Sequence, residues 1–332
     1  MMQSAKRYFL LGLCIILFVG SSCSKEDEAS PDNGEVTWGS GIKIPADLQG
    51  RLIYDWVDEG VLTVDTRTGA KSVLLNEEVR GNGFDISRDG RIRLTSTDIR
   101  GNYDASQYTL SNVADGSIVS QFEFYPPNGG SKYNSGLLSP DNSLIAIKPT
   151  FEEGIIILDK SGKEVVHLTA INNNAFTRND RVEWLPGNGI VFTNGKYILK
   201  AVPPYTNATL VKEMNYQDWG NVKVSQDGQK ISVLIDKHIY LMNIDGSNLT
   251  QVTTSKTQEL EAVFSPDGKY LLVGSDFRRT GVFGAVHNLK IIPADGKLYD
   301  LDAEQMASSS AIPVIPKGET KIETSDGIML WR

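Results

Sequence analysis

One turn signature recurs along this chain and restricts the folds that the chain can adopt. In residues 262–274, two short apolar runs flank the tetrapeptide Ser265-Pro266-Asp267-Gly268. Proline presets φ, aspartate hydrogen-bonds its own backbone and glycine accepts a positive φ, so this tetrapeptide predicts a tight turn between two strands. One such hairpin cannot bury its own apolar surface in water, and further copies are therefore needed.

Copies of the turn follow at nearly regular intervals. They begin at residues 87, 139, 185, 225 and 265, with steps of 52, 46, 40 and 40, and a sixth copy begins at Thr324. A second turn follows the first within most intervals, at residues 65–69, 114–116, 159–162, 244–248 and 293–296. Two hairpin turns per unit predict a four-stranded antiparallel meander, and a period of about 40–45 residues is typical of a β-propeller blade.

The repeats carry a family resemblance. SPDGKYLLVG (residues 265–274) and LMNIDGSNLTQVT (residues 241–253) resemble the WD-like repeats of the TolB-type six-bladed β-propeller, over roughly residues 49–332. The resemblance implies an all-β domain over residues 43–332 with six four-stranded antiparallel blades. It implies no single function, because that family includes binding modules, peptidase-associated propellers and sugar-acting lyases.

The first blade is incomplete in the sequence. Residues 51–75 supply three strands without the usual opening turn, whereas the last copy ends in Ile328-Met329-Leu330-Trp331. We expect this C-terminal strand to join the N-terminal strands in one blade, which closes the ring and removes open sheet edges. The other blades are expected at residues 82–124, 134–169, 181–212, 219–254 and 260–302.

The first 22 residues have the anatomy of a secretory leader. Lys6 and Arg7 form a basic start, and residues 8–19 form an apolar run that is too short to span a bilayer comfortably. Gly20-Ser21-Ser22-Cys23 resembles a lipobox, with Gly20 where leucine is usual. We expect residues 1–22 to be a lipoprotein signal peptide and Cys23 to carry lipid, palmitate included. The alternative is an ordinary signal peptide with an incidental cysteine.

Cysteine usage is compatible with acylation. The chain has 2 cysteines, and Cys14 would leave with the leader, so Cys23 would be alone and no disulfide or thiolate metal site is expected. Residues 24–28, a lysine followed by acids, resemble the export signal of surface-exposed lipoproteins of some Gram-negative bacteria. We expect a flexible tether over residues 23–42 and an anchor in the outer membrane, exposed at the surface or facing the periplasm. A merely solvated polar segment is the alternative.

The two faces of a propeller differ in their connections. The tight turns lie on one face, which we call the turn face, and the longer connections lie on the other, which we call the loop face. Loops on a rigid scaffold usually carry function, and aromatic and arginine side chains are the usual anchors of recognition. We therefore expect a ligand on the loop face, held by Tyr133, Arg178, Tyr216, Trp219, Arg278 and Arg279. For any one of these residues, packing against a blade edge or simple solvation is the alternative.

Signals for catalysis are sparse. GxSxG, HExxH, Walker and GxGxxG motifs are missing from the sequence, and the 3 histidines are His167, His238 and His287. His238 and His287 are expected near the loop face, but without placed carboxylates they make a weak metal site. No catalytic residue, metal or cofactor is expected, and the net charge of −8 argues against nucleic acid.

Two functions therefore stay open. The first is a monomeric, membrane-anchored binding module for a glycan, a peptide or a partner protein. The second is a carbohydrate-active lyase or hydrolase with its site in the channel of the loop face. A convergent cluster of His, Asp and Glu at the channel mouth would distinguish the second from the first.

Overall fold

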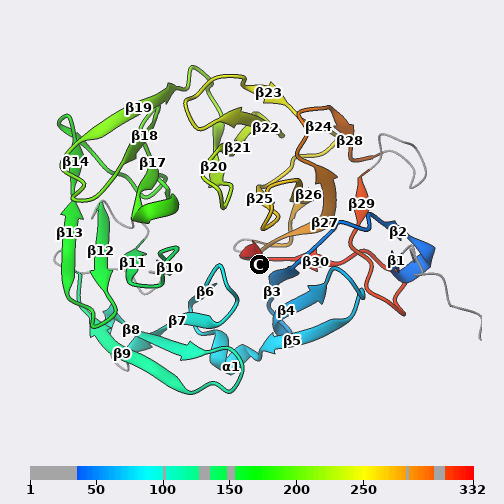
Figure 1. Ribbon diagram of the computed structural model, residues 1–332, viewed down its shortest axis with the longest axis horizontal. Coiled ribbons are helices and arrows are strands. Elements are labelled where there is room, and N and C mark those ends of the chain that lie inside the picture. Colours follow the sequence, from blue (N-terminus) through cyan, green and yellow to red (C-terminus); the bar gives the residue numbers. More distant parts are fainter. Residues whose placement is uncertain (1–35, 100–101, 127–134, 148–153, 282–283, 303–310) are drawn as a thin grey trace, which may run out of the picture. The chain divides into compact units, whose positions relative to one another are not determined.

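The fold is that of a computed structural model, which describes residues 36–99, 102–126, 135–147, 154–281, 284–302 and 311–332. The propeller forms one compact unit over Glu35–Arg332. Six antiparallel blades surround a central axis, and in each the innermost strand lies beside the axis (Figure 1). The expectation of an all-β six-bladed propeller with mainly four-stranded blades is confirmed.

The first three blades have four strands each. From the axis outward, blade one contains β31 (Met329–Trp331), β3 (Arg51–Trp56), β4 (Gly60–Asp65) and β5 (Lys71–Leu75). After α1 (Glu77–Arg80), blade two contains β6 (Gly83–Ile86), β7 (Ile92–Ile99), β8 (Asn102–Asn112) and β9 (Ile118–Phe124). Blade three contains β10 (Gly136–Leu138), β11 (Leu144–Ile147), β12 (Ile155–Asp159) and β13 (Glu164–Leu168).

The second half of the ring repeats this pattern. Blade four contains β16 (Val182–Trp184), β17 (Ile190–Asn194), β18 (Tyr197–Ala201) and β19 (Ala208–Glu213), with η2 (Pro186–Asn188) in its first turn. Blade five contains β20 (Trp219–Val224), β21 (Lys230–Ile235), β22 (His238–Asn243) and β23 (Thr250–Gln251). Blade six contains β25 (Ala262–Phe264), β26 (Tyr270–Arg279), β27 (Ala285–Pro293) and β29 (Ile312–Pro313), and β30 (Thr324–Ser325) also pairs with β27.

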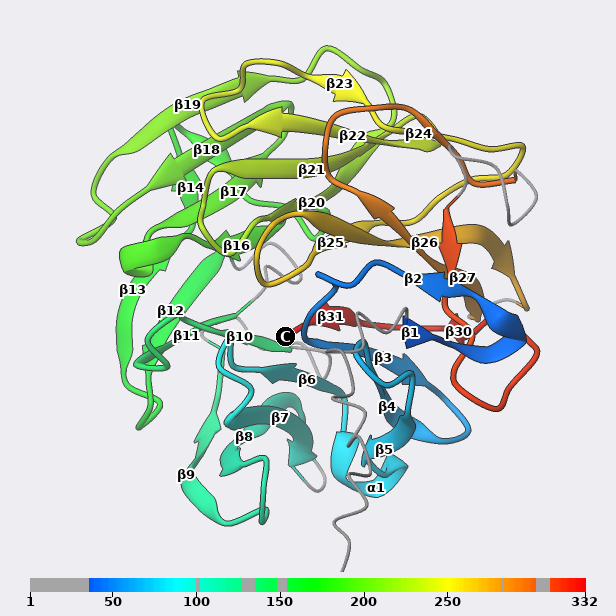
Figure 2. The same cartoon turned by 45° about the vertical axis from the view of Figure 1, so that its right-hand side comes forward.

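Short elements lie between and beside the blades, as the turned view in Figure 2 shows for β1 and β2. They are β1 (Val36–Thr37), η1 (Gly39–Gly41), β2 (Lys43–Ile44), β14 (Ala170–Ile171), β15 (Asn174–Ala175), β24 (Thr253–Thr254) and β28 (Tyr299–Asp300). No helix in the described ranges is both long and apolar enough to cross a membrane.

The two ends of the propeller meet in blade one, as expected. Strand β31 pairs with β3, with Leu52 opposite Trp331 and Tyr54 opposite Met329. Trp331 is fully buried, and its indole nitrogen donates to the carbonyl oxygen of Gln49 at 2.8 Å. The closing strand therefore lies at the centre of the ring, where Figure 1 also places the C-terminus.

The recurring turns owe their shape to one repeated set of hydrogen bonds. In the turn after β25, the Ser265 hydroxyl donates to the Asp267 carboxylate at 2.7 Å and accepts from the Tyr270 amide at 3.0 Å. Gly268 has a φ of 71°, which side-chain-bearing residues rarely adopt. The same serine-to-aspartate bond recurs in the turns that begin at residues 87, 139 and 225. This local chemistry explains why the signature marks the turn between the first two strands of a blade.

The apolar core is divided among the interfaces between blades. One cluster joins blade six to blade one and contains Trp331, Leu272 and Ile291, all fully buried. Another joins blade one to blade two through Ile53 and Ile86. Blade one thus buries apolar surface against both of its neighbours, and the ring is stabilised through the contacts between its blades.

The outer part of blade six differs from the expectation. The segment after the turn at residues 293–296 was expected as its fourth strand, but β28, within that segment, pairs in parallel with β24 at the edge of blade five. The place next to β27 is taken by Ile312–Pro313. Tyr299 and Leu301 are buried in the same cluster as Val252, and this apolar contact between blades explains the crossing.

The boundary between tether and propeller also differs. The tether was expected to extend to residue 42, but Trp38 is only 3% exposed and its indole nitrogen donates to the carbonyl oxygen of Thr66 at 3.2 Å. Strands β1 and β2 pair with each other around this residue. The buried indole thus makes residues 36–42 part of the propeller. Cys23 and the leader lie outside the described residues.

Candidate functional site

A groove opens on the loop face between blades four and five. Its volume is about 200 Å³, and the chain segments around it are the connection before β16, the β17–β18 turn and the start of β20. Trp219, the first residue of β20, is half-buried and lines the groove. The other lining side chains include Thr177, Asn179, Asp180, Arg181 and Thr193. An indole beside hydroxyl, amide and guanidinium groups is a typical composition for a recognition site.

A buried carboxylate organises one wall of this groove. Asp180 is 3% exposed and accepts hydrogen bonds from the Thr177 amide at 2.6 Å and from the Gly195 amide at 3.2 Å. The Thr193 hydroxyl donates to the same side chain at 3.2 Å. These bonds connect the loop before β16 to the β17–β18 turn, so the wall is preorganised for a ligand.

The predicted residues Arg178 and Tyr216 lie in the segments next to this groove. The Arg181 guanidinium donates to the main-chain oxygens of Arg178 at 3.1 Å and of Asp180 at 3.0 Å, which fixes the loop that presents the exposed Arg178 side chain. Tyr216 is 40% exposed and lies in the connection that leads into β20. Three of the predicted residues therefore lie in one region of the loop face: Arg178, Tyr216 and Trp219.

Arg278 and Arg279 belong to a different kind of structure. The segment 275–288 was expected to be a loop, but its described ends extend β26 and β27 into a two-stranded ribbon, with Arg278 opposite Val286 and Arg279 opposite Ala285. Successive strand residues point to opposite faces, so the side chains of Arg278 and Arg279 diverge from each other. Arg278 donates instead to the Asn288 side-chain oxygen at 3.2 Å. Tyr133 lies outside the described residues.

The two histidines expected near the loop face have separate environments. His238 contacts Glu259 at 3.1 Å, and this fully buried carboxylate also accepts from the Ile239 amide at 2.9 Å. His287 is 1% exposed, and burial lowers its pKa to about 4 although Glu261 acts in the opposite direction. In the part of the chain that the structure describes, no three His, Cys, Asp or Glu side chains gather as a metal site would require.

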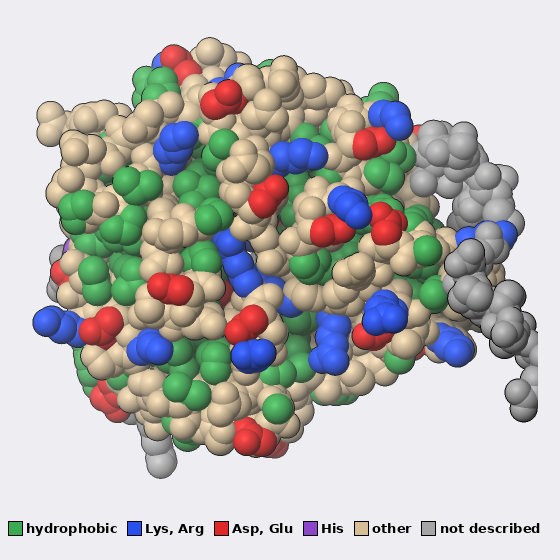
Figure 3. Space-filling model, viewed as in Figure 1, with side chains coloured by type: hydrophobic (Ala, Val, Ile, Leu, Met, Phe, Trp, Pro, Cys, Tyr) green, Lys and Arg blue, Asp and Glu red, His purple; other side chains and the backbone are tan. Residues whose placement is uncertain are grey.

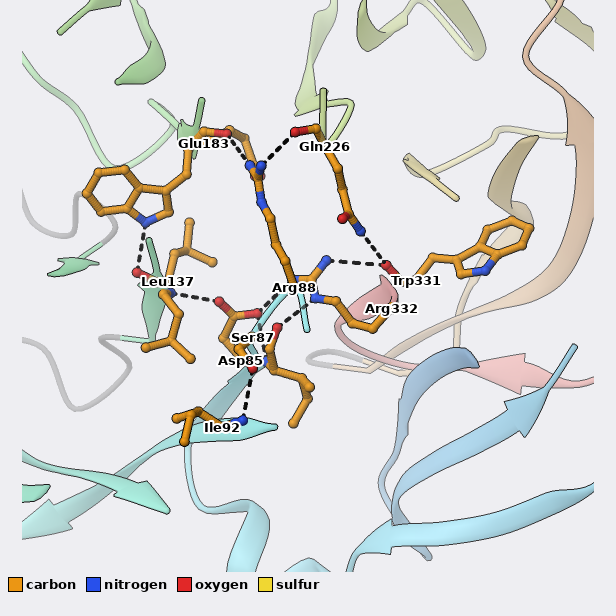
Figure 4. Close-up of polar contacts among 12 residues, drawn as sticks. Asp85, Ser87, Arg88, Ile92, Leu137, Glu183, Gln226, Trp331 and Arg332 are labelled. Atoms are coloured by element: carbon orange, nitrogen blue, oxygen red, sulfur yellow. Dashed lines mark hydrogen bonds and ion pairs between the residues drawn. The ribbon is translucent and has the colours of Figure 1, made fainter. Parts of the chain in front are cut away.

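A brace that the sequence did not suggest crosses the central channel on the turn face. The Arg88 guanidinium donates to the carbonyl oxygen of Gln226 at 2.7 Å, as Figure 4 shows. It also donates to the carbonyl oxygen of Trp184 at 2.8 Å. It thereby joins blade two to blades five and four. The one signal available was positional: Arg88 and Gln226 occupy the turn position that is proline in Pro140 and Pro266.

Charged side chains also fill the channel above this brace. The Lys223 ammonium lies 3.2 Å from Glu183 and 3.5 Å from Glu261. Burial acts to lower the pKa of Lys223, but the two carboxylates outweigh it and raise that pKa. The space left among these groups and Arg88 is about 70 Å³, which is room for only a few water molecules. The channel end on the turn face is therefore closed to a sizeable ligand.

Comparison with known proteins gives matches to solved structures. No family model and no curated protein matches the chain. A crystal structure of TolB from Acinetobacter baumannii has 15% identity and a TM-score of 0.56, covering 88% of this chain and 68% of its own. A structure assigned as TolB from Agrobacterium tumefaciens has 16% identity and a TM-score of 0.51, covering 75% of this chain and 87% of its own. At these identities the likeness concerns the fold, and the chain has the TolB-type six-bladed propeller fold.

Proposed function

We propose that this protein is an outer-membrane lipoprotein whose propeller is a non-enzymatic binding module, with its ligand site in the loop-face groove beside Trp219. The ligand is a glycan, a peptide or a segment of a partner protein. The groove itself carries this proposal, since it combines a half-buried indole with a wall that Asp180 holds in place.

The composition of the groove supports recognition by stacking and hydrogen bonding. The Trp219 ring supplies a flat apolar surface, and the side chains of Thr177, Asn179 and Arg181 supply donors and acceptors around it. The exposed Arg178 adds a cation in the adjacent loop. A rigid aromatic anchor surrounded by polar groups binds with a small loss of conformational entropy.

The anchoring part of the proposal rests on the leader. Residues 1–22 have the basic start, the apolar run and the small residues that precede a lipid-modified cysteine, and Cys23 is the only cysteine after them. A lipid on Cys23, followed by a polar tether, would hold the propeller close to the membrane surface.

Mass spectrometry of the native N-terminus tests the anchor. An acylated Cys23 at the start of the mature chain is expected. An unmodified Cys23 or an intact leader would contradict it.

Glycan and peptide arrays probed with the full chain test the binding function. We expect a restricted set of ligands to bind, and to be recovered unchanged when mass spectrometry is applied after incubation. Cleaved or eliminated products would instead indicate the lyase or hydrolase function, and an array without specific ligands of either kind would contradict the binding proposal.

A further inference from the structure

We propose that a second groove, on the turn face between blades one and two, binds an acidic peptide segment. Its volume is about 400 Å³, twice that of the loop-face groove, and it is lined by blade one, by the first turn of blade two and by Arg332. The inference is independent of the proposed function, because the two grooves lie on opposite faces and share no residue.

Arginine side chains give this groove its character. Arg51, Arg67, Arg88 and Arg332 all line it, in a chain whose net charge is −8. In Figure 3, Lys and Arg side chains lie in and around the central depression, with Asp and Glu side chains between them. Arg88 already donates to two carbonyl oxygens and Arg332 to Asp85, so the arginines available to a ligand are Arg51 and Arg67. The planar guanidinium group matches a carboxylate with two parallel hydrogen bonds, so this pair favours a ligand with two or more carboxylates.

The two acidic residues that line the groove, Asp65 and Asp89, are hydrogen-bonded within their own turns. Asp65 accepts from the Thr68 amide at 3.0 Å, and Asp89 accepts from the Ser87 hydroxyl at 2.5 Å, so both carboxylates are engaged in their own turns. Within the described ranges, the exposed Arg51 and Arg67 side chains make no ion pair. Their guanidinium groups therefore keep their full hydrogen-bonding capacity toward a ligand.

A buried hydroxyl on the wall of the groove also points to a ligand. Thr63, on β4, is 5% exposed, and its hydroxyl oxygen has no hydrogen-bond partner among the described residues. A buried polar group without a partner is uncommon in folded proteins because it loses its bonds to water. A peptide amide or carbonyl in the groove would supply this partner.

The apolar part of the lining selects between classes of acidic ligand. It consists of the aliphatic side chains of Ile53, Leu74, Ile86 and Val113, and the described lining contains no aromatic ring. Aliphatic surface suits aliphatic side chains, and arginine clusters are a known mode of recognising acidic peptide motifs. We therefore favour a peptide with acidic and aliphatic residues over an acidic sugar.

The test is selection of a random octapeptide library on the immobilised full chain, at low and at high salt. Peptides with two or more Asp or Glu residues next to Leu, Ile or Val should be enriched, and their binding should weaken with salt. Trigalacturonate and inorganic phosphate serve as competing probes. If these two probes bind in an arginine-dependent manner while no acidic peptide is enriched, the peptide assignment is overturned.

Two charge-matched double variants locate the site. Arg51→Glu with Arg67→Glu should weaken binding of the enriched peptides at least tenfold. Lys160→Glu with Lys163→Glu changes the net charge equally at two exposed residues of a blade-three turn, and it should leave binding within twofold of the wild type. Equal losses in the two variants would show general electrostatic attraction and contradict the groove.

Thr63→Val separates a ligand contact from a structural role. The substitution removes the unpartnered hydroxyl at nearly constant volume, so the melting temperature should stay the same or rise. Peptide binding should nevertheless fall severalfold. Unchanged peptide binding in this variant would overturn the assignment of the hydroxyl to the site.

Discussion

The Arg332 guanidinium lies 3.0 Å from the Asp85 carboxylate, and this contact joins the strand that closes the ring to the innermost strand of blade two. Asp85 also accepts from the Leu138 amide at 2.7 Å, which extends the connection to blade three. Three consecutive blades are thus held at the centre of the ring by one buried carboxylate, whose side chain is only 4% exposed.

Removing this carboxylate should destabilise the whole propeller. Asp85→Ala leaves the Arg332 guanidinium and the Leu138 amide without their partner, and a broken buried pair costs about 3–5 kcal/mol. Urea unfolding measures the loss of free energy. As a control, Lys196→Ala breaks an ion pair whose two side chains are half exposed, and it should change stability little. Equal effects of the two variants would contradict the role of Asp85.

The closing strand should contribute in the same global way. Trp331 has no exposed surface, and replacing a buried tryptophan with alanine costs about 3–5 kcal/mol through lost transfer energy and the cavity left behind. We expect the Trp331→Ala variant to unfold in one cooperative transition, with a lower urea midpoint than the wild type. Val119→Ala, at a 48% exposed position of β9, is the control for loss of an apolar side chain. An unchanged midpoint in Trp331→Ala would contradict closure by this strand.

His287 should make stability depend on pH. Burial depresses its folded pKa to about 4, below the unfolded value of 6.5, so the unfolded chain binds the proton more readily. Stability is then complete above pH 6.5 and decreases as the pH falls toward 4, by about 3 kcal/mol. Urea unfolding across this range measures the slope.

The His287→Leu variant has no titrating side chain at position 287. Its stability should therefore no longer show the decrease that His287 causes between pH 6.5 and pH 4. Acid destabilisation from the turn aspartates should remain, since the hydroxyl of Ser117 holds the pKa of Asp115 below its usual value, and such carboxylates lose their contribution below about pH 4. An identical slope in wild type and variant would show that His287 does not titrate in this range.

The parts of the fold that depend on local chemistry were predictable from the sequence. The bond from Ser265 to Asp267 needs only neighbouring residues, so the tetrapeptide marks a turn wherever it occurs. Counting strands in residues 51–75 was enough to predict closure by the C-terminal strand. The crossing of β28 to β24 was not predictable, because it depends on a contact between Tyr299 and a neighbouring blade.

The candidate sites were harder to predict, because they also depend on contacts between residues that are distant in the sequence. Arg88 contacts the carbonyl oxygens of residues that are 96 and 138 positions away, and only the closed ring brings them together. The loop-face set was predicted from residue type and loop polarity, and the structure has a groove beside one of its members, Trp219. That reasoning could not predict that Arg278 and Arg279 point to opposite faces, because the sequence did not indicate that β26 extends this far.

The most direct test of the proposed function compares two single variants on the array ligands. Trp219→Ala, on the loop face, should weaken binding by about 1 kcal/mol or more, which is about fivefold or more, through lost stacking or cation–π contact, with little change in melting temperature. Asp245→Ala, in an exposed turn on the turn face, should bind as the wild type does. If Asp245→Ala loses binding while Trp219→Ala keeps it, the working face has been assigned the wrong way round and the proposal fails.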